Sequence, residues 1–298
     1  MRILTLPEIR NALRYPEVIG LMREALLADC DTPMPMHLDV PAESGEVHMK
    51  SSYCRRGKYF ALKIASTFPR NRERGLPTGN GMMLLCSAET GEPLAMLADE
   101  GHLTDVRTAA VSAMIAREIG RSDRVLGILG TGIQARLTAR MHAEALPLER
   151  IVLWGRSRER AEECARDIAD VATVEIVDCP AEVARRARLI VTVTASRAPL
   201  LMAGDLAPGT HVTAVGADGP GKQELDPEIL RRADWILADS VRQCERIGEL
   251  QHAPDQAGRA REFRDGRFAP GEVTVADLTG LGAEDLFIGQ HAYERSVV

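Results

Sequence analysis

The sequence predicts an α/β protein in which a doubly wound parallel sheet is joined to a smaller α+β domain. A chain of 298 residues is too long for one small core, so about two domains are expected. From about residue 120 to 240, short β-branched strands alternate with helical segments, which is typical of a parallel sheet covered on both faces. A glycine-rich turn at residues 130–135 follows the first of these strands and marks the edge where such sheets bind ligands.

The N-terminal third has a different pattern, which predicts mixed α+β structure. Apolar side chains recur at helical spacing in residues 16–28. Strand-like runs occupy residues 46–53, 59–66 and 81–86, and a turn at 88–91 precedes a further run at 93–99, which predicts a hairpin.

A helix is predicted to begin at Thr104 or Asp105 and to end at Gly120, after which the alternating pattern starts. The tail returns to a strand and then to an amphipathic helix from about residue 282, which we expect to pack on the first domain. The predicted domains are therefore residues 1–115 with 281–298, and residues 116–280.

Composition excludes several classes of partner. The hydrophobic share of 45% and charged share of 27% are ordinary for a soluble globular protein. A net charge of −6 argues against nucleic acid or an anionic membrane as the main partner. No run approaches the ~18 apolar residues of a spanning helix, and charges interrupt the N-terminal apolar runs, so no signal peptide is predicted.

The six cysteines are scattered and never spaced as Cys-x-x-Cys. This pattern predicts no metal site and no disulfide framework, and it favours a cytoplasmic location.

The glycine turn has the chemistry of a pyrophosphate site. Gly130 allows a tight turn, and Gly132 lets the backbone approach a pyrophosphate without a Cβ in the way. The following helix contributes backbone amides and a partial positive charge at its N-terminus. We therefore predict a Rossmann-type domain that binds NAD(P), with cofactor contacts from Gly130, Thr131, Gly132, Ile133 and Gln134. Valine at Gly132 should occupy the pyrophosphate volume and disfavour any positive φ required there.

The end of the second strand bears on the choice of coenzyme. NAD-preferring sites usually place an acid there for the ribose 2′-hydroxyl, but here Trp154 is followed by Gly155-Arg156-Ser157-Arg158. Arg156 and Ser157 could instead bind a 2′-phosphate through charge-assisted hydrogen bonds. NADP(H) is therefore favoured and NAD(H) remains possible. The alternative is that Arg156 and Arg158 simply begin a solvated helix.

Further motifs extend over nearly the whole chain. They are Leu62-Lys63, Gly75-Leu76-Pro77, residues 103–110 (LTDVRTAA), the glycine turn, residues 216–225 (GADGPGKQEL) and residues 273–280 (VTVADLTG). Together they resemble the ornithine cyclodeaminase/mu-crystallin family, and the segments RTAA and GADGPGK are the most discriminating. Within the family, residues 45–51 (GEVHMKS) look most like members linked to ectoine breakdown and iminosuccinate reduction.

The resemblance implies hydride exchange between a nicotinamide and the α-carbon of an amino or imino acid, and it implies a homodimer formed by the substrate-binding domain. Thr108 matches a pyrophosphate or substrate contact. The remaining residues that we expect to contact the cofactor are Thr194, Ser196 and Val215.

The resemblance also assigns three residues at the reacting centre. Lys63 matches a substrate-facing lysine, and Ala61 and Ala65 beside it leave room for a ligand. Arg107 matches the arginine that grips the substrate carboxylate, which suits a planar bidentate group. Asp218 matches an acid–base or amino-positioning carboxylate. From the residues alone, these could equally be a solvated lysine, a helix-start arginine in a salt bridge and a turn aspartate.

The sequence departs from the family pattern at the substrate side chain. Val47 stands where ornithine cyclodeaminases have a glutamate that recognises the distal amine, which weakens ornithine as the substrate. The early Pro-x-Arg motif is also absent, since the segment is Pro33-Met34-Pro35-Met36-His37. His37, His48 or Lys50 could supply the missing positive charge, or could be surface residues. We include Lys50 and His48 among the predicted substrate-binding residues.

Three functions follow from this reasoning. The leading one is NAD(P)-dependent oxidoreduction at an α-carbon, with reduction of an α-imino acid as the favoured direction. The rival is a cyclodeaminase lyase that recycles a bound nucleotide and releases ammonia. A non-enzymatic binding protein is the third, and the joint presence of Lys63, Arg107 and Asp218 argues against it.

Overall fold

The computed structural model describes residues 1–297 and divides into two compact units. Unit 1 comprises Met1–Arg107 and Leu281–Val298, and unit 2 comprises Thr108–Gly280. The division therefore lies between Arg107 and Thr108, inside the helix α3 (His102–Glu118), and the predicted boundary at 115/116 falls further along the same helix. No helix within residues 1–297 is long and apolar enough to cross a membrane.

Unit 1 is built on a largely antiparallel sheet of order β1-β7-β6-β5-β4-β2, in which β3 also pairs with β4. Its strands are β1 (Arg2–Thr5), β2 (Cys30–Asp31), β3 (Met36–Val40), β4 (Gly45–Cys54), β5 (Tyr59–Thr67), β6 (Gly79–Ser87) and β7 (Pro93–Ala98). Short 3-10 helices lie at η1 (Pro41–Glu43) and η2 (Pro69–Arg74).

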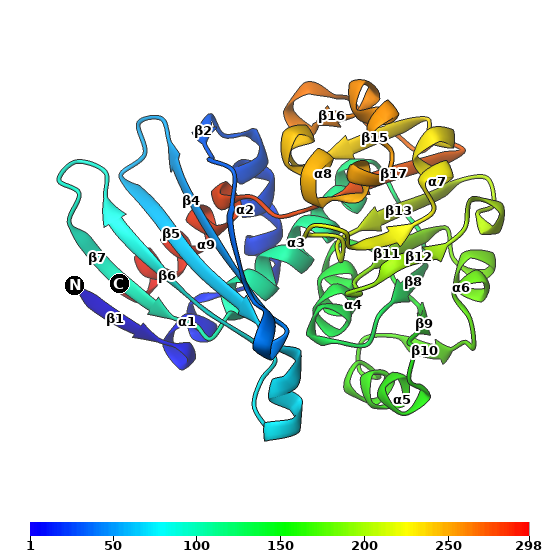
Figure 1. Ribbon diagram of the computed structural model, residues 1–298, viewed down its shortest axis with the longest axis horizontal. Helices are drawn as coiled ribbons and strands as arrows, with labels where there is room; N and C mark the ends of the chain where they lie inside the picture. The colour runs from blue at the N-terminus through cyan, green and yellow to red at the C-terminus, as the bar shows by residue number, and fades with distance from the viewer. Residues whose placement is uncertain (298) are drawn as a thin grey trace. The chain divides into compact units, whose positions relative to one another are not determined.

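Three helices complete unit 1. They are α1 (Leu6–Ala12), α2 (Tyr15–Leu27) and α9 (Gly282–Val297). Helix α9, drawn in red in Figure 1, packs against β4, β5 and β6 and against α1 and α2. Side chains alternate between the two faces of the sheet. Ala61 and Met83 lie on the face that α9 covers and are buried, whereas Leu62 and Met82 lie on the opposite face and are exposed.

Unit 2 is a parallel sheet of order β10-β9-β8-β11-β13-β17-β15-β16 (Figure 1). Its strands are β8 (Val125–Leu129), β9 (Arg150–Trp154), β10 (Thr173–Ile176), β11 (Leu189–Thr192), β13 (Thr210–Ala214), β15 (Trp235–Ala238), β16 (Arg261–Glu262) and β17 (Val273–Asp277). A separate parallel pair joins β12 (Arg197–Leu201) to β14 (Gln223–Leu225).

The helices of unit 2 connect successive strands. They are α4 (Ile133–Ala145), α5 (Arg158–Asp167), α6 (Pro180–Arg186), α7 (Pro227–Arg232) and α8 (Val241–Ile247), with 3-10 turns at η3 (Ala203–Asp205), η4 (Glu249–His252), η5 (Pro254–Arg259) and η6 (Phe263–Asp265). Because β9 and β10 lie on one side of β8 while β11 and β13 lie on the other, the strand order reverses between β8 and β11. This topological switch point is where doubly wound sheets bind ligands. The predicted fold class is confirmed.

Two local predictions are wrong. Helix α3 begins at His102, because the carboxylate of Asp99 accepts a hydrogen bond from the Leu103 amide at 2.8 Å, so neither Thr104 nor Asp105 caps it.

Cys30 and Cys54 form a disulfide, contrary to the expectation from their spacing. The antiparallel pairing of β2 with β4 places these two cysteines opposite each other although 24 residues separate them. The cysteine pattern consequently gives no support for a reducing compartment.

Candidate active site

Two lysines of unit 1 lie side by side on the buried face of the sheet. Lys63 on β5 pairs in register with Lys50 on β4, and both side chains point to the face that α9 covers. Lys63 is only 3% exposed and Lys50 is also buried. The small neighbour Ala61 lies on the same face of β5. The structure thus brings Lys63, which is predicted at the reacting centre, beside Lys50, which is predicted to bind substrate.

One carboxylate of α9 bridges Lys63 to Arg107. Asp285 Oδ2 lies 2.7 Å from the Lys63 Nζ, and Asp285 Oδ1 accepts a hydrogen bond from Arg107 Nε at 3.0 Å. Both oxygens of a single carboxylate are therefore used to orient two basic groups. Such charge-assisted contacts are the strong ones in proteins, and here burial removes competing water.

Arg107 is held from a second direction as well. Its Nη1 donates to Glu284 Oε2 at 2.8 Å, and the guanidinium is almost fully buried. Arg107 comes from the first half of α3, whereas Glu284 and Asp285 occupy the first turn of α9, where acids also complement the helix dipole. Arg107 thus forms salt bridges, as the alternative interpretation expected, and both of its acidic partners belong to unit 1.

The buried setting changes the protonation of this cluster. Burial lowers the pKa of Lys63 to about 7, although the charge of Asp285 opposes this and those of Arg107 and Lys50 reinforce it. Burial alone would raise the pKa of Asp285, but the nearby charges of Lys63 and Arg107 outweigh it and keep this pKa below its ordinary value. Burial raises the pKa of Asp99, which the charge of Lys63 partly offsets. A lysine with such a pKa can gain or lose a proton near neutral pH.

His48 lies on the same face of β4 as Lys50, two residues away. Its ring packs edge to face on that of His37 with 4.4 Å between ring centroids, and its Nε2 lies 3.8 Å from Glu46 Oε2. His37 in turn lies 3.1 Å from Asp39. Both histidines therefore have acidic neighbours, and a substrate contact by His48 stays a prediction.

The glycine turn of unit 2 lies at the switch point of the sheet. Gly130 has φ of 132°, and a Cβ there would lie 2.8 Å from the carbonyl oxygen of Val193, so only glycine fits. Gly132 has φ of −83°, which any residue adopts, so its backbone conformation does not require glycine. A Cβ at Gly132 would instead point into open space at the N-terminus of α4. That open space beside helix amides fits a pyrophosphate.

Hydrogen bonds from an arginine that no sequence motif had indicated stabilise this turn. Arg136, in the first turns of α4, donates from Nη1 to the carbonyl oxygens of Thr131 and Gly132 at 2.7 and 3.2 Å. Its other nitrogens contact Asp167 on α5. Ile133 is exposed and Gln134 is half-buried, and their predicted cofactor contacts stay predictions.

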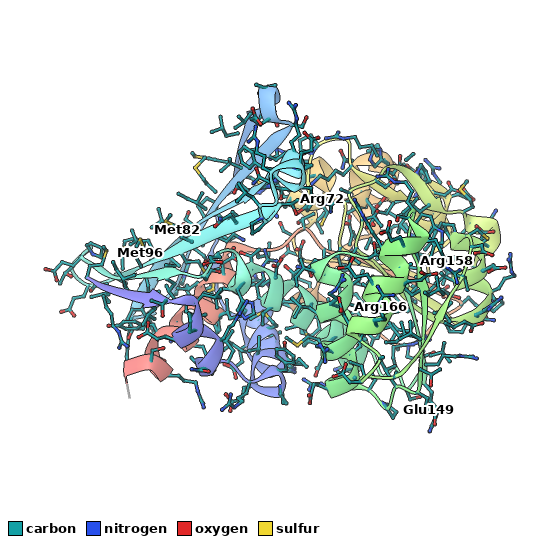
Figure 2. The ribbon with its side chains drawn as sticks, turned by 90° about the horizontal axis from the view of Figure 1, so that it is seen from below. Arg72, Met82, Met96, Glu149, Arg158 and Arg166 are labelled. Atoms are coloured by element: carbon teal, nitrogen blue, oxygen red, sulfur yellow. A yellow bond between two sulfur atoms is a disulfide. The ribbon has the colours of Figure 1, made fainter. Side chains whose placement is uncertain are left out.

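The residues after β9 have different environments. Arg156 is exposed. Ser157 caps α5, because its hydroxyl oxygen accepts a hydrogen bond from the Arg160 amide at 3.3 Å. Arg158 (Figure 2) forms ion pairs with Glu162 and Asp178. It therefore fits the alternative interpretation, in which it belongs to the solvated start of a helix.

The loops after β11 and β13 contain the remaining predicted cofactor residues. Thr194 and Ser196 follow β11, and buried Val215 follows β13, where its amide donates to Thr192 O at 3.0 Å. The Ser196 hydroxyl donates to Ala198 O at 2.7 Å. Thr194 donates from both its amide and its hydroxyl to Glu224, a buried residue missed by the sequence analysis. These loops lie at the carboxyl edge of the sheet, where the cofactor is expected.

Asp218 and Thr108 belong to unit 2. Asp218 lies in the loop after β13, and its Oδ1 is 2.8 Å from Lys222 Nζ. An ion pair of this kind keeps the carboxylate oriented while 45% of the Asp218 side chain stays exposed. Thr108 is half-buried and follows Arg107 within α3. The functional roles of both residues stay predictions.

The fold and the glycine turn define the chain as a two-unit α/β protein of the dinucleotide-binding class. Comparison with known proteins identifies the family: residues 2–297 match the model of the ornithine cyclodeaminase/mu-crystallin family. The chain belongs to this family and is an enzyme.

Three known proteins are similar to the chain over most of its length. The chain is 38% identical over 279 residues, 89% of its length and 84% of the other, to a protein of Sinorhizobium fredii named as an uncharacterized cyclodeaminase. An archaeal alanine dehydrogenase dimer with bound NAD superposes with a TM-score of 0.90 at 28% identity, over 100% of this chain and 96% of the other. The iminosuccinate reductase of Paracoccus denitrificans in complex with NAD⁺ also gives a TM-score of 0.90, at 27% identity and the same coverages.

Gly132→Val should weaken nucleotide binding by about 10- to 100-fold or more while the protein stays folded. A valine would fill the open space beside the α4 N-terminus, and forcing a side chain against an occupied volume costs about 1–3 kcal/mol or more. Calorimetric titration with NADH and NADPH measures the effect. Gly204→Val is the matched control, because a Cβ at Gly204 also meets open space within the same unit. Unchanged affinity in the Gly132→Val variant would remove this turn from the nucleotide site.

Proposed function

We propose that the protein is an NAD(P)-dependent oxidoreductase that reduces a small α-imino acid to the corresponding amino acid. Two supporting relatives have names that describe redox chemistry at such a carbon, an alanine dehydrogenase and an iminosuccinate reductase. In the overall reaction, carbon gains a hydride and nitrogen gains a proton. A bound nicotinamide would supply the hydride, and the turn from Gly130 to Gln134 would hold its pyrophosphate.

The observation that carries this proposal is the bridging of Lys63 and Arg107 by Asp285. A guanidinium has five N–H donors and an ammonium has three, so one bridging carboxylate can orient both groups and still allow them to bind another. Lys63 and Arg107 are thereby pre-organised for a substrate carboxylate in a dry site, where electrostatic contacts are strongest. The register of Lys50 beside Lys63 adds positive potential on the same face.

Burial lowers the pKa of Lys63 to about 7, so the charge of this side chain changes near neutral pH. We assign to Lys63 the binding of the substrate carboxylate in the protonated form. Asp218 is the acid–base residue that the family resemblance implies, and its Oδ1 lies 2.8 Å from the Lys222 Nζ.

For the coenzyme, we propose a preference for NADP(H) over NAD(H). The segment after β9 has no acid to repel a 2′-phosphate, and exposed Arg156 is available to pair with it. Ser157 already serves as the cap of α5, although its hydroxyl proton can still be donated.

For assembly, we propose a homodimer formed through the outer face of the sheet in unit 1. This face carries exposed Leu62, Ile64 and Met82, each between 43% and 45% exposed. Figure 2 shows Met82 and Met96 projecting on the side of the sheet away from its helices. An apolar face of this kind is typical of an interface between subunits, and the archaeal relative is described as a dimer.

A reductase and a cyclodeaminase differ in what they consume. We expect NADPH or NADH absorbance to fall in proportion to amino acid formed when a panel of α-keto acids with ammonium, or preformed cyclic imines, is supplied. The control is a separate panel of diamino acids supplied without added coenzyme, in which ammonia release is measured. Ammonia release with constant nicotinamide absorbance would replace the reductase proposal with the lyase.

Arg156→Ala should weaken NADPH by about 1–3 kcal/mol, the range for losing a hydrogen bond to a charged group, and leave NADH nearly unaffected. The reason is that only NADPH carries the 2′-phosphate. Fluorescence titration of both coenzymes measures the difference, and Arg158→Ala is the control because Arg158 is paired with Glu162. Equal losses for NADPH and NADH, or a wild-type preference for NADH, would show that Arg156 does not read the phosphate.

The pKa of Lys63 predicts the pH dependence of kcat/KM. Lys63 is an ammonium below about pH 7 and a neutral amine above it, so kcat/KM for a carboxylate substrate should fall as the pH rises through that value. Lys63→Arg should remove this limb, because arginine stays charged at every pH tested. The groups facing Lys63 are Asp285, Arg107, Lys50 and Asp99, and they are unchanged in this variant. An identical limb in the Lys63→Arg variant would assign the titration to another group.

A further inference from the structure

Glu224 connects two loops that belong to neighbouring strands of the main sheet. It lies on β14, outside that sheet, and its carboxylate is fully buried. Four donors surround it: Thr192 Oγ1 at 2.7 Å, the Thr194 amide at 2.6 Å, Thr194 Oγ1 at 2.7 Å and the Gly216 amide at 2.8 Å. The donors of Thr192 and Thr194 come from the end of β11, and that of Gly216 comes from the loop after β13.

The position of these loops gives the contacts a functional meaning. β11 is the strand next to β8 across the switch point, and the loop after it touches the nucleotide turn, because Gly130 leaves no room for a Cβ against Val193. The two loops are also tightly joined to each other. A Cβ at Gly216 would lie 2.6 Å from the Thr194 nitrogen and 2.7 Å from the Glu224 Cδ. The Gly216 backbone therefore packs directly against Thr194 and Glu224, with no room for a side chain between them.

Glu224 is itself held in place by a second and a third buried carboxylate. Glu249 accepts hydrogen bonds from the amides of Glu224 and Leu225 at 2.7 and 3.2 Å. Asp277, the last residue of β17, accepts from the amides of Glu249 and Leu250 at 3.0 and 2.9 Å. Each carboxylate thus fixes the backbone of the next acidic residue. The series begins in a central strand of the sheet and ends at the loops after β11 and β13.

A doubly wound sheet binds a dinucleotide across the switch point, with one nucleotide on each half. The glycine turn and Arg156 lie on the half formed by β8, β9 and β10, whereas Glu224 acts on the half formed by β11 and β13. We propose that Glu224 is a positioning residue that fixes the nicotinamide half of the cofactor site and leaves the adenosine half unaffected. The proposal rests on the proposed function, since it needs a nicotinamide dinucleotide to position.

Glutamine is the informative substitution at this position. The glutamate oxygens together accept from four donors, with one threonine hydroxyl and one backbone amide at each oxygen. A glutamine side chain would place an NH₂ group against one such pair. The hydroxyl can turn to accept from this NH₂ group, but the backbone N–H would face another donor in a buried site, which is costly. Burial raises the pKa of Glu224, while the hydrogen bonds from Thr192 and Thr194 favour its charged form. Glutamine would keep the shape of the site and reverse the hydrogen-bond polarity at one of the two oxygens.

The test compares NADH with ADP-ribose, which lacks only the nicotinamide, by calorimetric titration of the full chain. Glu224→Gln should weaken NADH by about 10-fold, as expected for a buried mismatch of this kind, and change ADP-ribose by less than about 2-fold. Asp226→Asn is the matched control, because Asp226 also accepts from backbone amides nearby but anchors α7 and η3. It should leave both affinities unchanged. Gly132→Val should weaken both probes together.

Equal weakening of NADH and ADP-ribose in the Glu224→Gln variant would overturn the proposal in favour of a general structural role, and so would unchanged affinity for both. If Glu224→Gln does not fold, Thr192→Val decides, since it removes one donor to Glu224 at nearly constant volume and should give a smaller loss confined to NADH. Wild-type protein that binds neither NADH nor NADPH would overturn the proposed function and this inference with it. If only NADPH binds, the same comparison is made between NADPH and 2′-phospho-ADP-ribose. Wild-type binding of both probes without the selective loss would overturn the inference alone.

Discussion

A carboxylate that leaves water has to find donors within hydrogen-bond distance, because an unpaired buried charge is far too costly to keep. Both units are organised around carboxylates that meet this condition. In unit 1, Asp285 forms ion pairs with Lys63 and Arg107, and without it these two buried basic side chains would face each other. In unit 2, Glu224 receives hydroxyls and backbone amides from two loops. In each unit, a buried acid therefore orients the groups that donate to it.

The two acids differ in what they organise. Asp285 orients side chains, so its effect is on the charge and direction of the groups that would contact a substrate. Glu224 orients backbone, so its effect is on the shape of the loops that would contact a cofactor. A protein that must bring a substrate carbon and a nicotinamide into one geometry needs both kinds of order, since small displacements of reacting atoms have large effects on rate. The family membership of the chain is consistent with this division of roles.

Local signals allowed much of the fold to be predicted. The alternation of strand and helix, the position of the turn from Gly130 to Gln134 and the C-terminal helix near residue 282 all depend on short stretches of sequence, and the structure has them. Lys63 and Arg107 were found because their motifs resemble those of a family. The start of α3 was misplaced because Asp99, its cap, precedes the helical pattern instead of opening it.

The features that escaped prediction are long-range pairings. Arg107 and Asp285 are 178 positions apart, and nothing near either residue indicates the other. The pairing of Cys30 with Cys54 depends on the register between β2 and β4, which spacing alone does not reveal. The sequence Gln223-Glu224-Leu225 does not distinguish Glu224 from a solvated acid, because its four donors come from the end of β11 and the loops after β11 and β13, which the sheet topology brings together.

Unit 1 is discontinuous in sequence, and this has a consequence for how the protein is made. The ribosome releases Lys63 and Arg107 long before it reaches α9, so during synthesis the two basic residues have no Asp285 or Glu284 to neutralise them. Unit 2 can complete its sheet first, because β17 precedes α9 in the chain. Domains generally fold as units while the chain emerges. A nascent chain cut short before Gly282 would thus carry the parallel sheet of unit 2 together with a unit 1 in which Lys63 and Arg107 lack their carboxylate partners.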